Sequence, residues 1–201
     1  LANMAIEMGA KAGIVHPDGL DLEEDVSALH PDADAVYLKT IRFDASRLLP
    51  QVSRPHMPDQ VTTIENVVGT KVDVAFIGTC VNGRLEDLHA AAQVLEGKQV
   101  PPSVRLMVAP ASREVFLNAM MDGTAETLIR AGATFLPSGC GPCVGTHNGV
   151  PGPDETAIST GNRNFKGRMG NPKSSVYLAS PMTVAASALA GHIVHPIIEG
   201  V

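Results

Sequence analysis

The sequence predicts an α/β fold, in which a mostly parallel sheet lies between helices in an α/β/α arrangement. Apolar runs typical of strands alternate along the chain with stretches of helical periodicity. The 201 residues are 44% hydrophobic and 18% charged, which provides enough apolar material for a packed core and argues against disorder. Gly (19) and Pro (15) are plentiful, whereas aromatic residues make up only 3%, so tight turns and close backbone packing are expected.

The first part of the chain gives the less regular prediction. Residues 1–11 are expected to be the end of a helix, because apolar residues recur at helical spacing. A helix-like acidic stretch is expected over 22–29 and a strand over 35–43. Residues 49–58 contain three prolines and little periodicity, which is typical of a linker or a crossing between domains.

Strands and helices alternate more clearly in the rest of the chain. Strands are predicted at 72–77, 104–108, 133–136, 156–159 and 176–179, and helices at 88–95, 112–120, 126–130 and 181–190. Ser112 is a suitable N-cap for the second of these helices. Ser180 and Pro181 mark the start of the last helix and Gly191 its end.

Charge and apolar pattern argue against two classes of partner. Lys and Arg (15) are fewer than Asp and Glu (21), and the net charge of −6 disfavours a nucleic-acid-binding surface. The uncharged run 174–198 is long enough for a bilayer, but it contains Pro181, Gly191 and two histidines, so we expect no membrane span. The start at Leu1 shows no signal peptide and looks truncated. An odd number of cysteines, three, suits a reducing cytoplasm.

All three cysteines follow predicted strands, where parallel sheets build their sites. Cys80 lies in FIGTCVNGR, and Cys140 and Cys143 lie in LPSGCGPCVG. The CGPC segment alone is compatible with a redox disulfide, half a zinc site or two cluster ligands. Its flanking glycines leave the backbone able to approach a bulky inorganic group, and no long amphipathic helix follows as in a thioredoxin-like protein. Three thiolates around an iron–sulfur cluster would leave one iron open for catalysis.

A polar segment, STGNRNFKGRMG, follows another predicted strand. It brings Asn162, Arg163 and Arg168 within seven residues, and guanidinium groups bind carboxylates through two parallel hydrogen bonds. We therefore expect Arg163 and Arg168 to bind a substrate with two or three carboxylates.

These three motifs, with YLASPMTVAASALAG near the end, resemble the large-subunit signatures of the aconitase superfamily, most nearly its 3-isopropylmalate dehydratase and homoaconitase branch. The resemblance covers essentially the whole chain. It implies a hydro-lyase with a four-iron, four-sulfur cluster, in which Cys80, Cys140 and Cys143 are ligands and one iron has no cysteine. It also implies that Arg163 and Arg168 bind substrate carboxylates.

The resemblance implies further roles and further chains. Asn162 is expected against the cluster, Asn3 beside it, and Glu7 near the substrate hydroxyl. Residues 1–56 would be the end of the second domain and 57–201 the third domain. An N-terminal region with His and Asp catalytic residues and a small subunit with a Ser base would complete the enzyme. Thr79, Val81 and Gly161 depart from commoner family residues without removing a ligand.

The sequence thus predicts a fragment of an iron–sulfur dehydratase that isomerises a small hydroxy acid in the cytoplasm, with 3-isopropylmalate dehydratase of leucine biosynthesis as the first choice. Homoaconitase, dimethylmalate dehydratase and aconitase are alternatives within the superfamily. A noncatalytic metal-binding or thiol-redox module is the alternative of another class, whereas the acidic charge and few aromatics disfavour an RNA-binding regulator.

Overall fold

The computed structural model describes residues 1–17, 26 and 29–196, and the chain forms two compact units, Leu1–Leu48 and Leu49–Val201. The first unit has little regular structure: the short 3-10 helices η1 (Ala2–Met4) and η3 (Ala45–Arg47). The prediction of a helix over 1–11 was therefore too long, because one helical turn is marginal by itself and Gly9 adopts a positive φ of 80°.

The predicted strand over 35–43 was wrong, since these residues form no strand. No strand among the residues that the structure describes pairs with them, and Val36 is 96% exposed. The expected acidic helix over 22–29 falls mostly outside the described residues.

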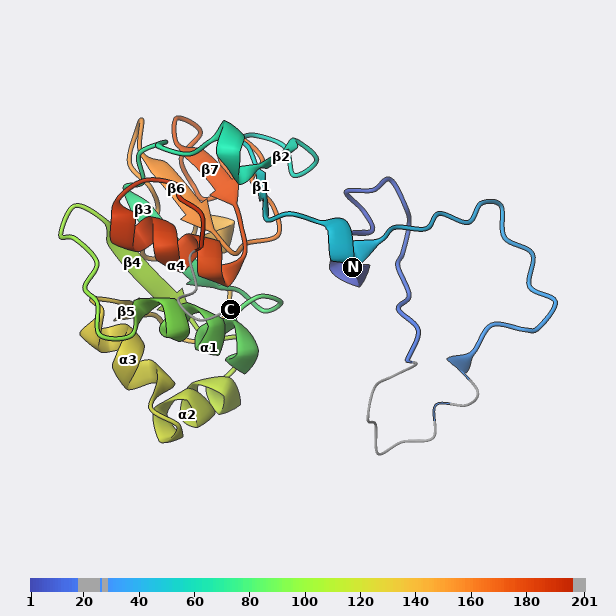
Figure 1. Ribbon diagram of the computed structural model, residues 1–201, viewed down its shortest axis with the longest axis horizontal. Helices are drawn as coiled ribbons and strands as arrows, with labels where there is room; N and C mark the ends of the chain where they lie inside the picture. The colour runs from blue at the N-terminus through green and yellow to red at the C-terminus, as the bar shows by residue number, and fades with distance from the viewer. Residues whose placement is uncertain (18–25, 27–28, 197–201) are drawn as a thin grey trace. The chain divides into compact units, whose positions relative to one another are not determined.

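Over residues 49–196, the described part of the second unit, the structure has a seven-stranded sheet and four α-helices (Figure 1). The strands are β1 (Gln51–Ser53), β2 (Val61–Thr63), β3 (Val74–Gly78), β4 (Arg105–Ala109), β5 (Thr134–Phe135), β6 (Thr156–Ser159) and β7 (Ser175–Leu178). The helices are α1 (Leu85–Leu95), α2 (Arg113–Met121), α3 (Thr124–Arg130) and α4 (Pro181–Ala190), with the 3-10 helices η4 (Ile64–Asn66) and η5 (Gly141–Val144).

The strand order is β2-β1-β7-β6-β3-β4-β5. Strands β3 to β7 pair in parallel, whereas β1 and β2 form an antiparallel edge that joins β7 at Ser53 and Leu178. The α/β class with a mostly parallel sheet is confirmed. Residues 49–58, expected as a linker, instead contribute β1 to this sheet. The boundary between the two compact units lies after Leu48, eight residues before the domain boundary predicted after His56. The assignment of the two parts to the second and third domains of the family stays a prediction.

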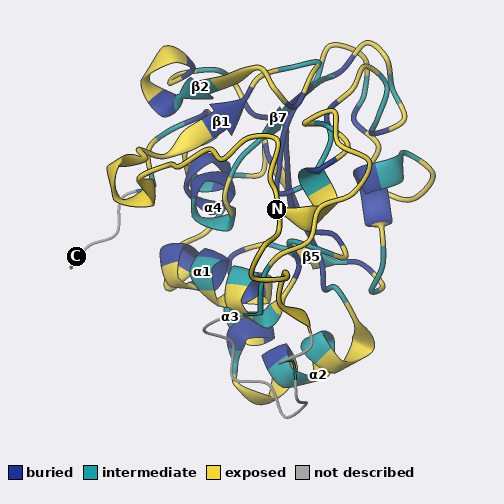
Figure 2. Ribbon diagram, turned by 90° about the vertical axis from the view of Figure 1, so that its right-hand side faces the viewer, coloured by how far each residue is buried: buried dark blue, intermediate teal, exposed yellow. Residues whose placement is uncertain are grey.

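The sheet is buried on both faces. Side chains of β3 alternate between two core clusters: Ala75 and Ile77 join the larger one, which includes α1, α3 and α4, and Val74 and Phe76 join the smaller one. Loop residues, Cys143 and Met169 among them, complete the smaller cluster. Buried positions concentrate along the inner sides of α1 and α4 (Figure 2).

The predicted helix ends are confirmed. Ser112 Oγ accepts a hydrogen bond from the Val115 N–H (3.2 Å) at the start of α2. Pro181 is the first residue of α4, and Gly191 ends that helix with φ 72°. No helix among the described residues has the length and apolar character that a membrane crossing needs.

Candidate functional site

The parallel strands place the predicted site residues at one edge of the sheet. The loop after β3 carries Cys80, the loop after β5 carries Cys140 and Cys143, and the loop after β6 carries the polar segment 162–168. Because all these strands run in the same direction, the three loops leave the sheet at its carboxyl edge. Residues that are up to 88 positions apart in sequence (80 and 168) therefore belong to one region of the second unit.

The loop after β3 turns sharply and leaves Cys80 exposed. Thr79 is buried and has φ 90°, in the left-handed region that a residue with a Cβ rarely adopts. Its Oγ1 holds the turn by accepting a hydrogen bond from the Asn82 N–H (3.1 Å). The residue after Asn82 must be a glycine, because a Cβ at position 83 would lie 2.6 Å from the Ala109 carbonyl oxygen. Strained backbone conformations that surrounding contacts hold in place are characteristic of functional loops.

Two polar side chains join this loop to the loop after β6. The hydroxyl of the buried Thr160 accepts from the Gly78 N–H (2.8 Å) and donates to the Gly78 carbonyl (2.9 Å). The Asn82 side-chain amide donates to the Thr160 carbonyl (2.5 Å) and to Asn162 Oδ1 (3.0 Å). The Cys80 loop is thereby tied to the predicted cluster-side residue Asn162.

The CGPC segment forms η5, with Cys140 exposed at its N-cap and Cys143 buried against the sheet. Gly145 ends η5 with φ 73°, and a Cβ on it would collide with the backbone of Gly170. This close approach places η5 against the far end of the loop after β6. The sequence instead predicts contact of the glycines beside the cysteines with an inorganic group.

Arg168 and Gly161 connect the same two loops at the cysteine. Arg168 Nε donates a hydrogen bond to the Cys143 carbonyl (3.0 Å). A Cβ built on Gly161 would lie 4.0 Å from Cys143 Sγ, so this thiol faces the glycine backbone at the start of the polar segment. The structure therefore brings Cys143, Gly161 and Arg168 together.

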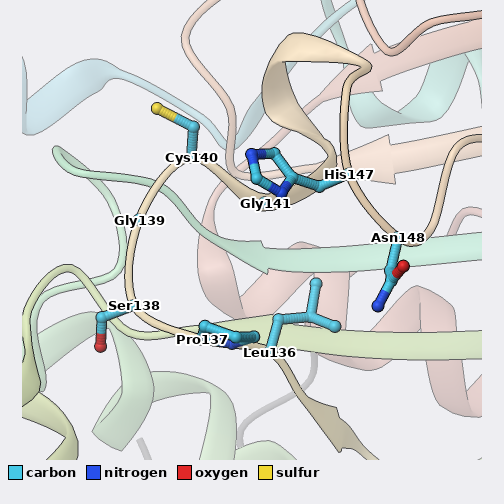
Figure 3. Close-up of a pocket in the computed structure, with 8 residues that line it drawn as sticks. All are labelled: Leu136, Pro137, Ser138, Gly139, Cys140, Gly141, His147 and Asn148. Atoms are coloured by element: carbon cyan, nitrogen blue, oxygen red, sulfur yellow. The ribbon is translucent and has the colours of Figure 1, made fainter.

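A cavity of about 270 Å³ opens beside Cys140. Its lining runs from Leu136 to Gly141 and includes His147 and Asn148. Figure 3 shows the imidazole ring of His147 over the backbone at Gly141, next to Cys140. The sequence favours a structural loop histidine at 147 over a hydrogen-bonding residue near the cluster, and the structure places His147 in the lining of this cavity together with the predicted ligand Cys140.

Three thiols are a donor set that fits an iron–sulfur cluster with one iron left open. All three thiols are free, so Cys140 and Cys143 form no disulfide. Among the residues the structure describes, no three His, Cys, Asp or Glu side chains converge where one metal ion could bind. The thiolates around a four-iron cluster bind separate iron atoms and need no such convergence. Open space beside Gly139 leaves room next to Cys140.

Two expected residues belong to the other unit. Asn3 lies in η1 and Glu7 in the turns that follow it. Each of them makes an interaction in the structure, and their roles at a cluster or a substrate stay predictions.

Sequence reasoning missed two asparagines in the motifs. Asn164 is fully buried, and its Nδ2 donates to the carbonyls of Arg54 (2.8 Å) and Val176 (3.0 Å), so it anchors the loop to β1 and β7. Asn82 joins the loop after β3 to the loop after β6 through Thr160 and Asn162. Its Asn-Gly sequence signals a tight turn, but nothing in the sequence says that its amide reaches residue 162.

Comparison with known proteins identifies the group to which these motifs belong. A family model described as the aconitase family (aconitate hydratase) matches residues 65–191. The homoaconitase large subunit of Thermus thermophilus is 52% identical over 198 residues, which are 98% of this chain and 47% of that protein. The 3-isopropylmalate dehydratase large subunit of Herpetosiphon aurantiacus is 51% identical over 197 residues, which are 98% of this chain and 47% of that protein.

A third relative, the probable methanogen homoaconitase large subunit of Methanosarcina mazei, is 52% identical over 203 residues, 98% of this chain and 51% of that protein. The chain thus spans about half the length of the curated relatives it matches. The resemblance carried by the cysteine and arginine motifs is confirmed: the chain belongs to the aconitase family.

Proposed function

We propose that the chain is part of the large subunit of an iron–sulfur hydro-lyase that isomerises a small hydroxy acid by dehydration and rehydration. The observation that carries this proposal is that the loops with the three free thiols and the two arginines all follow parallel strands at one edge of the sheet, where Arg168 donates to the Cys143 carbonyl. The first choice of reaction is that of 3-isopropylmalate dehydratase, in leucine biosynthesis. Homoaconitase is the second, since relatives of both names match equally well.

Cys80, Cys140 and Cys143 would hold the cluster. When bound, it would supply a Lewis-acidic iron that no cysteine occupies, able to polarise the substrate hydroxyl. Arg163 and Arg168 would bind the substrate carboxylates and fix their orientation, which lowers the entropic part of the barrier. Asn162 would provide a hydrogen-bond donor beside the cluster. The family resemblance gives Asn3 a role beside the cluster and Glu7 a role near the substrate hydroxyl.

The remaining parts of the reaction belong to other segments. The base that removes the proton would come from the small subunit, and the His and Asp partners from a further region of the large subunit. Relatives named large subunit support a small-subunit partner, and three unpaired cysteines support a cytoplasmic enzyme.

The test uses the complete large subunit with the small subunit, reconstituted anaerobically with iron and sulfide. We expect a brown protein that converts 3-isopropylmalate faster than homocitrate, dimethylmalate or citrate. Cys80→Ser, Cys140→Ser and Cys143→Ser should each lose most of the iron, the sulfide and the activity. A colourless zinc protein without turnover would contradict the proposal and favour a noncatalytic metal-binding or thiol-redox module. Turnover that persists in all three variants would contradict the assignment of the cysteines.

A further inference from the structure

Asn82 lies two residues after Cys80 and faces Asn162 across the gap between two loops. We propose that Asn82 is a positioning residue that fixes the orientation of the Asn162 side-chain amide, so that Asn162 presents its NH₂ group to the ligand of the site. The inference concerns the site of the proposed function and rests on that function for the identity of the ligand. The orientation itself follows from hydrogen-bond polarity.

The polarity of two hydrogen bonds decides which atom of each amide faces which partner. The Thr160 main-chain carbonyl can only accept, so the Asn82 atom 2.5 Å from it is the amide nitrogen. That nitrogen carries two hydrogens and accepts none. Its second neighbour, 3.0 Å away on Asn162, is therefore the carbonyl oxygen Oδ1. With its oxygen turned toward Asn82, the Asn162 side chain has its NH₂ group as the donor for another partner.

Asn82 can impose this orientation because its own main chain is fixed on both sides. Its N–H donates to Thr79 Oγ1 (3.1 Å), and its carbonyl oxygen, 3.4 Å from Thr160 Oγ1, shares the hydroxyl hydrogen that the Gly78 carbonyl accepts at 2.9 Å. The next residue, Gly83, packs so closely on the Ala109 and Thr79 carbonyls that a Cβ would not fit. Because the main chain of Asn82 is fixed, the directions in which its side-chain amide can donate hydrogen bonds are restricted.

An NH₂ group is the useful end of Asn162 for an anionic ligand. Cluster sulfides, thiolates and carboxylates all carry negative charge and accept hydrogen bonds, whereas the carbonyl end would repel them. Hydrogen bonds to the sulfur atoms also tune the reduction potential of iron–sulfur clusters. Loss of the Asn82 amide would therefore act on the site through Asn162.

The orientation is tested first without a cluster, on the 201-residue chain labelled with ¹⁵N. Side-chain NH₂ signals of residues 82 and 162 are assigned by their disappearance in Asn82→Asp and Asn162→Asp. We expect slow hydrogen exchange for the Asn82 NH₂ group, which is bonded twice, and faster exchange for that of Asn162. Equal exchange of the two groups would overturn the proposed orientation, whether or not the chain binds a cluster.

The consequence for function is tested by a double-mutant cycle in the reconstituted complete enzyme. Asn82→Ala should lower kcat about tenfold in the parent, but less than twofold in an Asn162→Ala background, because the second change removes the group that Asn82 orients. Equal factors in both backgrounds would mean that Asn82 acts structurally and would overturn the proposal.

A matched control is available in the same loop region. Asn171 also donates its side-chain amide to a carbonyl, that of Pro151 (3.1 Å), but does not contact Asn162 in this way. Asn171→Asp should leave the exchange of the Asn162 NH₂ group unchanged, whereas Asn82→Asp, which cannot donate, should slow it by turning that group toward the new carboxylate. An equal effect of both variants would contradict the assignment.

Discussion

Arg168 has a structural partner in addition to its proposed substrate. Its Nε donates to the Cys143 carbonyl (3.0 Å), and a guanidinium group has further N–H donors in a planar fork. One side chain can thus hold the main chain of a cluster ligand and bind a carboxylate at the same time. Lysine has the same charge but neither the fork nor a donor at the Nε position.

Arg168→Lys should therefore impair both properties. One charge-assisted hydrogen bond is worth roughly 1.5–3 kcal/mol, so kcat/KM of the complete enzyme should fall about tenfold or more. The iron content per chain after dilution should fall as well, because the Cys143 carbonyl loses its donor. Steady-state kinetics and iron analysis measure the two effects. The control is Arg130→Lys, in the exposed ion pair with Glu126, which should leave both properties unchanged. Parent-like kinetics in Arg168→Lys would refute carboxylate binding by Arg168.

At the scale of elements, a polar network joins three neighbouring strands at the edge opposite the cysteines. Arg105 begins β4, and its guanidinium group donates to both carboxylate oxygens of Glu155, just before β6 (2.9 and 2.5 Å). Asp73, just before β3, accepts from the Thr156 N–H (3.0 Å). The hydrogen bonds from Arg105 hold the pKa of Glu155 below its ordinary value of 4.5, against the opposing effect of burial.

Glu155→Gln should lower the free energy of unfolding at neutral pH by about 0.2–1 kcal/mol, the range for solvent-exposed ion pairs. Because the folded-state pKa of Glu155 is lowered, its stabilisation is present above the unfolded-state pKa and is lost as the pH falls through the folded-state pKa. The difference between parent and variant should therefore shrink in acid. Urea unfolding at several pH values measures it. A difference that stays constant with pH would rule out the ionised pair as its cause.

At the scale of the whole molecule, the second unit has its own sheet and core, whereas the first exposes much apolar surface. In the first unit Val36 is 96% exposed and Ile14 95%, and of its described apolar residues only Ala5 is buried. The curated relatives are about twice as long as this chain. Both observations fit a functional enzyme that contains more than these 201 residues.

We therefore expect the 201-residue chain to show no dehydratase activity after reconstitution with iron and sulfide. Without a positioned base, proton transfer is unassisted, and that assistance is typically worth about 10²–10⁴ in rate. Turnover should require the full-length large subunit together with the small subunit, and neither alone should suffice. Steady turnover of any of the candidate acids by the isolated chain would contradict this, and His147, beside Cys140, would then be the first base to replace.

Local sequence determined most elements of the second unit, β1 and β2 excepted, and the chemistry of its motifs. Caps and apolar runs predicted α2, α4 and β6 nearly to the residue, because these signals act within a few positions. The cysteines and the arginines each follow a predicted strand, which predicted that they lie at one edge of the sheet. The reason is that loops after parallel strands leave the sheet at the same edge. The family followed from the same motifs.

The tertiary structure decided what depends on partners distant in sequence. The run 35–43 has a strand-like pattern but no strand with which to pair, and residues 51–53, in a proline-rich segment, became a strand because β7 lies beside them. Asn82, Asn164 and Arg168 acquired their roles in the same way, from carbonyls 12 to 110 residues away. Hydrogen-bond partners at such separations are set by the packing of the sheet, which local sequence does not encode.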